Sequence, residues 1–197
     1  MTAPLVQACL NGDRARREHP AIPVTPEELA VDAKRAVAAG AGALHVHVRG
    51  ADERDTLDAA LTTAAVEAIR ESCPDIPLGL TTGLWAAGGD PGRRLDQVAA
   101  WEALPDYVSV NVSEEGFAEL CGLLAERGVG VEAGVWSVAD AAALGGEPSG
   151  LVRALVEVGT AIPSRRWPER RRSRARSAPP ACGRPSSTTA RDWPPGR

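Results

Sequence analysis

Short apolar runs alternate with alanine-rich amphipathic stretches along most of this chain, and this alternation limits the possible folds more than any other feature. Apolar runs bounded by turn residues are typical of strands in a parallel sheet, and the amphipathic stretches between them predict connecting helices. We expect strands over residues 5–10, 43–48, 76–81, 107–112, 129–135 and 151–158. We expect helices over residues 26–40, 57–72, 95–101, 117–127 and 140–144.

The even rhythm of strands and helices favours an α/β fold of the (β/α)8 TIM barrel type over an open sheet. No glycine-rich dinucleotide fingerprint follows the first strand, which argues against a Rossmann domain. A complete barrel needs about 250 residues. We therefore expect an incomplete barrel of about six βα units. Its first helix has a clear start, because Thr25, Pro26 and Glu28 form the pattern of a capping box.

The C-terminal part of the chain differs in composition from the rest. Residues 1–159 contain 12 Lys and Arg against 24 Asp and Glu, whereas residues 160–197 contain 10 Arg, 7 Pro and only 2 acidic residues. We expect two parts: a partial TIM-barrel catalytic domain over 1–158, and a disordered, non-native Arg/Pro-rich tail over 159–197. A basic tail that touches RNA or anionic lipid is the alternative.

Out-of-frame translation of GC-rich DNA would explain the tail, because it produces Arg, Pro, Ala and Ser. If each free wobble base of the codons for residues 186–193 is G or C, reading two bases later gives Leu-His-His-Gly-Glu-Gly-Leu. Sequencing the gene tests this hypothesis. Other wobble bases, or a stop codon in the shifted frame, would contradict it.

Composition also limits the partners and the compartment. The acidic body argues against nucleic acid, since phosphate binding needs a basic face. No apolar run approaches the ~18 residues that a membrane span needs, and residues 1–11 lack the features of a signal peptide. The four cysteines, Cys9, Cys73, Cys121 and Cys182, show no paired spacing. We expect a soluble cytoplasmic protein with reduced thiols.

His45 and His47 are two of the three histidines in the chain, and they lie two residues apart on the second predicted strand. Strand geometry places both side chains on one face. In a barrel that face points inward, and functional residues gather at the carboxyl ends of the strands. Imidazole is the commonest metal ligand in proteins. The pair therefore predicts a metal site, with hydrogen-bonded core histidines as the alternative.

Several short motifs occur in an order that resembles the N-terminal signature of the β-keto acid cleavage enzymes, the family of 3-keto-5-aminohexanoate cleavage enzyme. They are Asn11-Gly12, His19-Pro20, Pro23, Thr25 to Ala30, Ala39-Gly40-Ala41 and His45 to Arg49. The resemblance covers residues 5 to about 158. It implies a Zn²⁺-dependent acyltransferase that joins a β-keto acid with acetyl-CoA to give acetoacetate and a new CoA thioester. It also implies that full-length relatives are homo-oligomers.

The resemblance assigns roles to individual residues. His45 and His47 match the zinc-binding histidines, and Thr81 matches a hydroxyl that contacts substrate. Asn111 and Ser113 lie where the family places polar groups that contact substrate, and Arg14 falls where some members carry a glutamate with that role. Each assignment has a simpler alternative, which is a turn cap for Thr81, strand-end hydrogen bonding for Asn111 and Ser113, and a solvated loop charge for Arg14. Glu114 is expected in the acidic first turn of a helix.

The family's third zinc ligand, a glutamate, lies in late strands that this sequence does not match. Two histidines alone bind zinc weakly, because catalytic sites use about three protein ligands. A truncated, inactive product is therefore a second hypothesis. A metal-dependent hydrolase of the amidohydrolase type is a third, although such enzymes carry the two histidines on strand one. A nucleic-acid-binding module rests on the tail alone.

Overall fold

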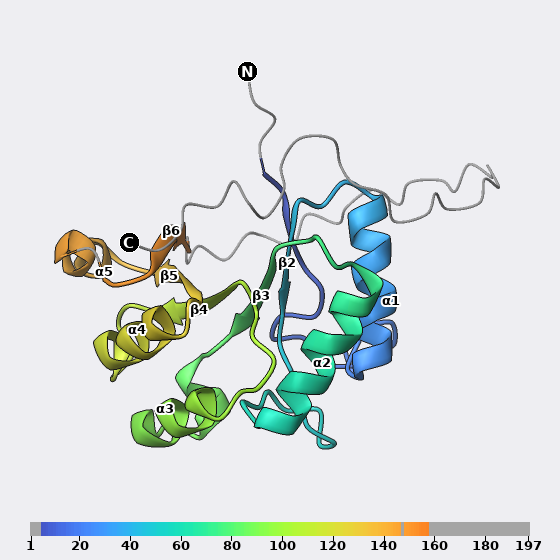
Figure 1. Cartoon of the computed structure of the whole chain (residues 1–197), viewed down its shortest axis with the longest axis horizontal. Helices are drawn as coiled ribbons and strands as arrows, with labels where there is room; N and C mark the ends of the chain where they lie inside the picture. The colour runs from blue at the N-terminus through green and yellow to red at the C-terminus, as the bar shows by residue number, and fades with distance from the viewer. Residues whose placement is uncertain (1–4, 147, 158–197) are drawn as a thin grey trace.

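A computed structural model describes residues 5–146 and 148–157, which form a six-stranded parallel sheet. Its strands follow one another in chain order, and each pairs with its sequence neighbours. Parallel crossovers are right-handed, so steps that all run in one direction place every connecting helix on the same face. Figure 1 shows α1 and α2 together beside the first strands and α4 and α5 beside the last. The predicted fold is confirmed as an incomplete TIM barrel, open between β6 and β1.

The strands are Gln7–Cys9 (β1), Ala43–Val46 (β2), Leu78–Thr81 (β3), Tyr107–Asn111 (β4), Gly130–Val135 (β5) and Leu151–Val156 (β6). The α-helices are Pro26–Ala38 (α1), Ala59–Ser72 (α2), Pro91–Ala99 (α3), Phe117–Glu126 (α4) and Val138–Ala143 (α5). Two short 3₁₀ helices are Leu84–Ala87 (η1) and Leu144–Gly146 (η2). The predicted tail over 159–197 lies outside the described residues.

The helix starts show where local sequence signals decide the structure. The capping box is confirmed, because the Thr25 hydroxyl accepts from the amide of Glu28 at 3.3 Å and Glu28 accepts from the amide of Thr25 at 3.1 Å. The predicted start of the third helix at Leu95 is wrong. The helix begins at Pro91, and Asp90 caps it by accepting from the backbone of Arg93 at 3.0 Å. The apolar pattern begins at Leu95, after the first turn of the helix, and therefore does not mark its start.

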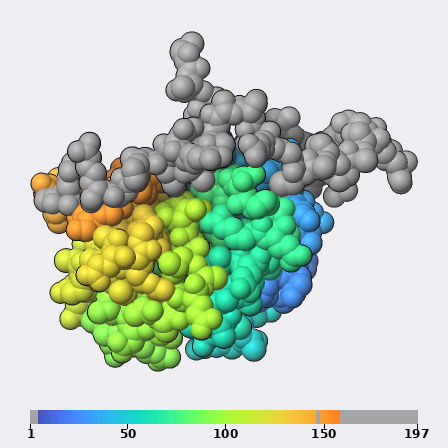
Figure 2. Space-filling model, in the orientation of Figure 1, coloured from blue at the N-terminus to red at the C-terminus, as the bar shows by residue number. Residues whose placement is uncertain are grey.

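The apolar core fills the space between the sheet and the helices. Leu44, Leu80 and Val108 are fully buried on the strands, and Leu29 and Ile69 are buried on the facing helices. In Figure 2, α2 (green to teal) and α4 (yellow) lie at the surface, to the right and left of the view. No helix within the described ranges is long and apolar enough to cross a bilayer.

The inner face of the sheet is polar, and its side chains reach across the open barrel. Glu132 on β5 is 1% exposed and accepts a hydrogen bond from Gln7 on β1 at 3.3 Å. Arg153 on β6 donates to both side chains and lies 4.6 Å from the ring centroid of Tyr107. The Tyr107 hydroxyl donates to the backbone oxygen of Leu44 at 2.7 Å. These contacts join the first strand to the last two.

The Tyr107 ring occupies the space above Gly79, so we expect Gly79→Ala to be destabilising. A Cβ at Gly79 would lie 2.2 Å from the Tyr107 ring. Overpacking of this kind costs about 1–3 kcal/mol of the free energy of unfolding, measured by chemical denaturation. Gly122→Ala is the matched control, because Gly122 faces open space on α4 and alanine should gain up to ~1 kcal/mol there. Equal stability of Gly79→Ala and the wild type would contradict the packing described here.

Candidate functional site

His45 and His47 lie at the carboxyl end of β2, and both rings are on the inner face. The side chains are buried, and the ring centroids are 5.4 Å apart in an edge-on arrangement. His45 pairs in register with Cys9 on β1 and with Gly79 on β3, whose inner side carries the Tyr107 ring. The period of the strand has therefore brought the two imidazoles together, as the sequence predicted.

His45 has the properties of an uncharged ligand. Burial lowers the pKa of its imidazole to about 3, with smaller contributions from the nearby His47 and Arg153. Its Nδ1 is buried and has no hydrogen-bond partner within residues 5–146 and 148–157. A buried polar atom without a partner is costly in a folded protein. A neutral imidazole with such an atom suits metal binding.

His47 is held by a carboxylate that the sequence reasoning missed. Its Nδ1 lies 2.8 Å from Oδ2 of Asp55, in the loop after β2. The same carboxylate accepts from Nε of Arg49 at 3.3 Å and from Nε1 of Trp85 at 2.9 Å. Burial raises the pKa of Asp55, but the hydrogen bonds from His47 and Trp85 and the charges of His47 and Arg49 outweigh it, so the pKa lies below its usual value.

The loop after β1 fixes the backbone beside the two histidines. The side chain of Asn11 donates to the backbone oxygen of His47 at 2.7 Å and accepts from its amide at 2.9 Å. Arg49 donates to the backbone oxygen of Gly12 at 2.7 Å. Asn11 and Arg49 are both buried. The end of β2 is therefore tied to the neighbouring loop on both sides of His47.

Thr81 lies at the end of β3 and is buried. Its hydroxyl oxygen accepts from the amide of Gly83 at 3.3 Å, which is the turn contact expected under the simpler alternative. That bond leaves the hydroxyl proton for another acceptor. The Trp85 indole packs directly against Gly83, where a Cβ would lie 2.1 Å from the ring. The indole stacks on His47, with ring centroids 6.4 Å apart.

Asn111 and Glu114 form a polar cluster at the end of β4. Asn111 donates to Oε1 of Glu114 at 2.8 Å and accepts from Nε1 of Trp136 at 2.8 Å. The placement expected for Glu114 is wrong, because α4 begins only at Phe117 and Glu114 turns back toward Arg94 at 2.5 Å. Ser113 is exposed in the turn beyond the strand. Asn111 therefore makes the strand-end hydrogen bonds that were the simpler alternative to substrate contact.

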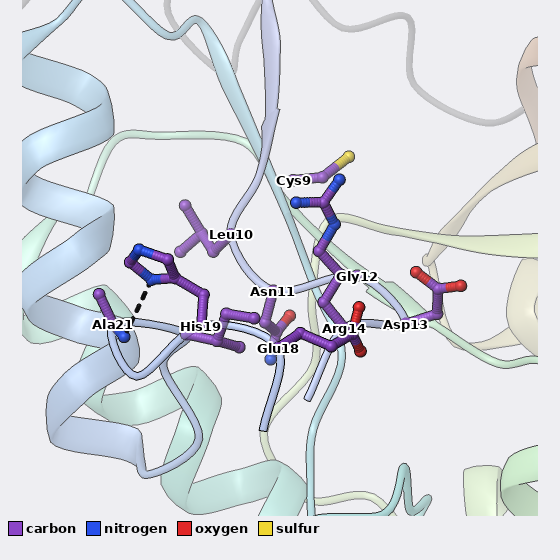
Figure 3. A pocket seen from close by; sticks show the side chains of 10 residues that line it. Cys9, Leu10, Asn11, Gly12, Asp13, Arg14, Glu18, His19 and Ala21 are labelled. Atoms are coloured by element: carbon purple, nitrogen blue, oxygen red, sulfur yellow. Dashed lines mark hydrogen bonds between the residues drawn. The ribbon is translucent and has the colours of Figure 1, made fainter. Parts of the chain in front are cut away.

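Arg14 lines a pocket of about 450 Å³ formed by the loop after β1. Figure 3 shows its side chain extending toward Cys9, while His19 lies on the other side of the pocket against Ala21. Nδ1 of His19 accepts from the amide of Ala21 at 3.2 Å, so the neutral ring carries its proton on Nε2. His19 in this form offers no free nitrogen to a metal.

The two histidines fit a metal ion as part of a site. They supply two neutral nitrogen ligands, one without a partner and one oriented by a carboxylate, as is usual for a metal-binding imidazole. Within the described part of the chain, no group of three or more His, Cys, Asp and Glu side chains is placed to hold an ion. The described residues therefore offer two candidate ligands, whereas catalytic zinc sites usually have three protein ligands.

Comparisons with known proteins show the family to which the chain is similar. Residues 4–147 match the family model described as beta-keto acid cleavage enzyme. The chain is 41% identical over 80 residues to 3-keto-5-aminohexanoate cleavage enzyme of Fusobacterium nucleatum, a match that covers 40% of this chain and 29% of the relative. It is 29% identical over 119 residues to 3-oxoadipate:acetyl-CoA acetyltransferase of Cupriavidus necator, covering 59% of this chain and 40% of the relative. The matches span well under half the length of these relatives.

Solved structures show the same fold. The ternary complex of ObcA with C4-CoA adduct and oxalate superposes with a TM-score of 0.54 at 18% sequence identity, covering 64% of this chain and 33% of that one. The apo structure of ObcA gives a TM-score of 0.53 at 19% identity, covering 64% of this chain and 32% of that one. At this identity the likeness concerns the fold alone. Because the family model matches well over half of its residues, the chain belongs to the beta-keto acid cleavage enzyme family.

Proposed function

We propose that this chain derives from a zinc-dependent enzyme that cleaves a β-keto acid with acetyl-CoA, giving acetoacetate and a new acyl-CoA. The observation that carries the proposal is the pair of buried inner-face imidazoles at the end of β2 in a member of this family. The relatives support the reaction class through their names, which specify a keto acid and, in one case, an acetyltransferase that uses acetyl-CoA.

His45 and His47 would hold the zinc ion, which when bound would act as a Lewis acid toward the keto oxygen. The two imidazoles make this end of the barrel polar, and the surrounding side chains limit its contact with water. Both imidazoles are less than a tenth exposed, and the Trp85 indole covers one of them. Limited access of water strengthens electrostatic interactions with a charge that develops on a substrate oxygen.

Thr81, Asn111, Ser113 and Arg14 are the proposed substrate contacts. Thr81 retains a hydroxyl proton for a substrate oxygen, and the Asn111 amide retains one N–H beyond its bond to Glu114.

The exposed guanidinium of Arg14 in its pocket favours a β-keto acid with a second negative group and disfavours one with an ammonium group. In a version of the protein that forms acetoacetate, Arg14→Glu should reverse that preference between acidic and amino β-keto acids at equal concentrations. An unchanged preference would remove Arg14 from the substrate site.

Zinc content and acetoacetate formation together test the proposal. The described residues supply two ligands, so the parent chain should hold much less than one zinc per chain after dialysis. A version of the gene read in the frame shifted by two bases from codon 160 onward, as far as the stop codon of that frame, should hold about one zinc per chain. It should also form acetoacetate from acetyl-CoA and some member of a panel of β-keto acids. Absence of both from that version would count against the proposed function. Hydrolysis without acetyl-CoA would favour the hydrolase alternative.

A further inference from the structure

We propose that Asp55 is a positioning residue that keeps the proton of His47 on Nδ1 and so leaves the Nε2 lone pair available for a metal. The proposal stands on the three donors that converge on one carboxylate. His47, Arg49 and Trp85 each place a ring or guanidinium nitrogen within 3.3 Å of an Asp55 oxygen.

The loop after β2 is folded so that Asp55 returns beside the strand end. Arg49 and Asp55 form an isolated antiparallel bridge, and the amide of Gly50 donates to the backbone oxygen of Arg54 at 2.9 Å. The turn between them passes through Glu53 with a φ of 61°, the left-handed region. The side chain of Asp55 is consequently 10% exposed, although it belongs to a loop. The backbone of this loop therefore determines where the Asp55 carboxylate lies.

The direction of the His47 hydrogen bond follows from the other two donors. The indole N–H of Trp85 and the Nε–H of Arg49 can only donate, so both Asp55 oxygens act as acceptors. Oδ1 of Asp55 forms a buried ion pair with Nε of Arg49 at 3.3 Å, and the permanently charged guanidinium pairs with the carboxylate form, which has no proton to donate. Nδ1 of His47 must therefore be the donor, and the neutral ring then carries a bare Nε2.

The ring has little freedom to turn away from this arrangement. Trp85 stacks on one face of His47 with an angle of 30° between the ring planes, and Asn11 holds the backbone on both sides of the peptide. Carboxylates that orient a metal-binding imidazole in this way typically change metal affinity 10–100-fold when removed. The assignment of zinc as the metal rests on the proposed function, whereas the tautomer of His47 does not.

Nitrogen-15 NMR of histidine-labelled full-length chain tests the tautomer directly, at a mildly alkaline pH and without metal. The chain contains three histidines, so His19→Gln and His45→Gln suffice to assign the signals. We expect His47 to be protonated on Nδ1 in the wild type and in Asp55→Glu, and to lose this preference in Asp55→Ala. Asp52→Asn is the matched control, because it removes an exposed carboxylate of the same loop and keeps the side-chain oxygen that accepts from the amide of Arg54 at 3.0 Å. The amide spectrum shows whether each variant is folded.

Zinc titration against a competing chelator provides the second measurement. Asp55→Ala should weaken binding of Zn²⁺ about 10–100-fold, and Asp52→Asn should not. A wild-type His47 protonated on Nε2, or a folded Asp55→Ala with an unchanged tautomer, would overturn the proposal. The expected tautomers in a chain whose shifted-frame version binds no zinc would leave Asp55 in its positioning role and count against the proposed function alone.

Discussion

Replacing Glu114 with leucine should lower the free energy of unfolding by about 3–5 kcal/mol, because it leaves a buried positive charge without its partner. The Arg94 side chain is 1% exposed, and its Nη1 lies 2.5 Å from Oε2 of Glu114. Its other hydrogen bond given by the structure goes to the backbone oxygen of Glu115, which carries no net charge. Chemical denaturation measures the loss.

The same carboxylate organises the mouth of the barrel, so the effect should extend to the candidate site. Glu114 accepts from the amide of Leu84, the first residue of η1, at 3.0 Å and from the Asn111 side chain at 2.8 Å. The next residue after Leu84 is Trp85, which covers His47. Near-ultraviolet circular dichroism should therefore show a weaker tryptophan signal in the folded variant.

Two variants separate loss of the charge pair from loss of the side chain. Glu115→Leu is the matched control, because this neighbour accepts from Arg94 through its backbone oxygen and its side chain is exposed. The double variant Arg94→Leu/Glu114→Leu should be more stable than Glu114→Leu alone, since no unpaired charge remains. If Glu114→Leu cost no more than Glu115→Leu, the buried pair would not matter to stability.

The parts of the fold that sequence reasoning predicted well are those set by local pattern. The strand spacing fixed a parallel sheet, the Thr25 capping box gave the start of α1, and the period of β2 placed His45 and His47 on one face. The start of α3 could also have been predicted, because Asp90-Pro91 is a recognised helix start. The apolar period alone begins at Leu95, one turn after the cap, and so indicates a later start.

The partners of the site residues were beyond the reach of local pattern. Asp55 contacts His47 only because the loop between them contains a left-handed turn and folds back on the strand end. The number of residues between His47 and Asp55 does not predict this contact. Glu114 looked like a helix-start acid, but its role is set by the burial of Arg94, twenty residues earlier in the chain. Such contacts depend on which loops the barrel brings to one edge. The sequence indicates which polar side chains lie at that edge of the sheet, but it does not show which of them contact one another.

Acid should destabilise the metal-free protein through His45, starting well above the range in which carboxylates titrate. The pKa of His45 is lowered from 6.5 to about 3 in the folded chain, first by burial and then by His47 and Arg153. Unfolding therefore binds a proton between these two values, so this contribution to stability is present above pH 6.5 and is lost as the pH falls toward 3. One proton corresponds to a slope of about 1.4 kcal/mol per pH unit.

The slope of the free energy of unfolding against pH, measured between pH 6.5 and about 4.5, tests this expectation because most carboxylates remain charged there. His45→Gln should flatten the slope by close to one proton, whatever its effect on absolute stability, since glutamine does not titrate. His19→Gln replaces an exposed histidine and shows whether losing any imidazole has the same effect. A slope that His45→Gln leaves unchanged would mean that His45 titrates alike in the folded and unfolded chain, so that burial does not lower its pKa.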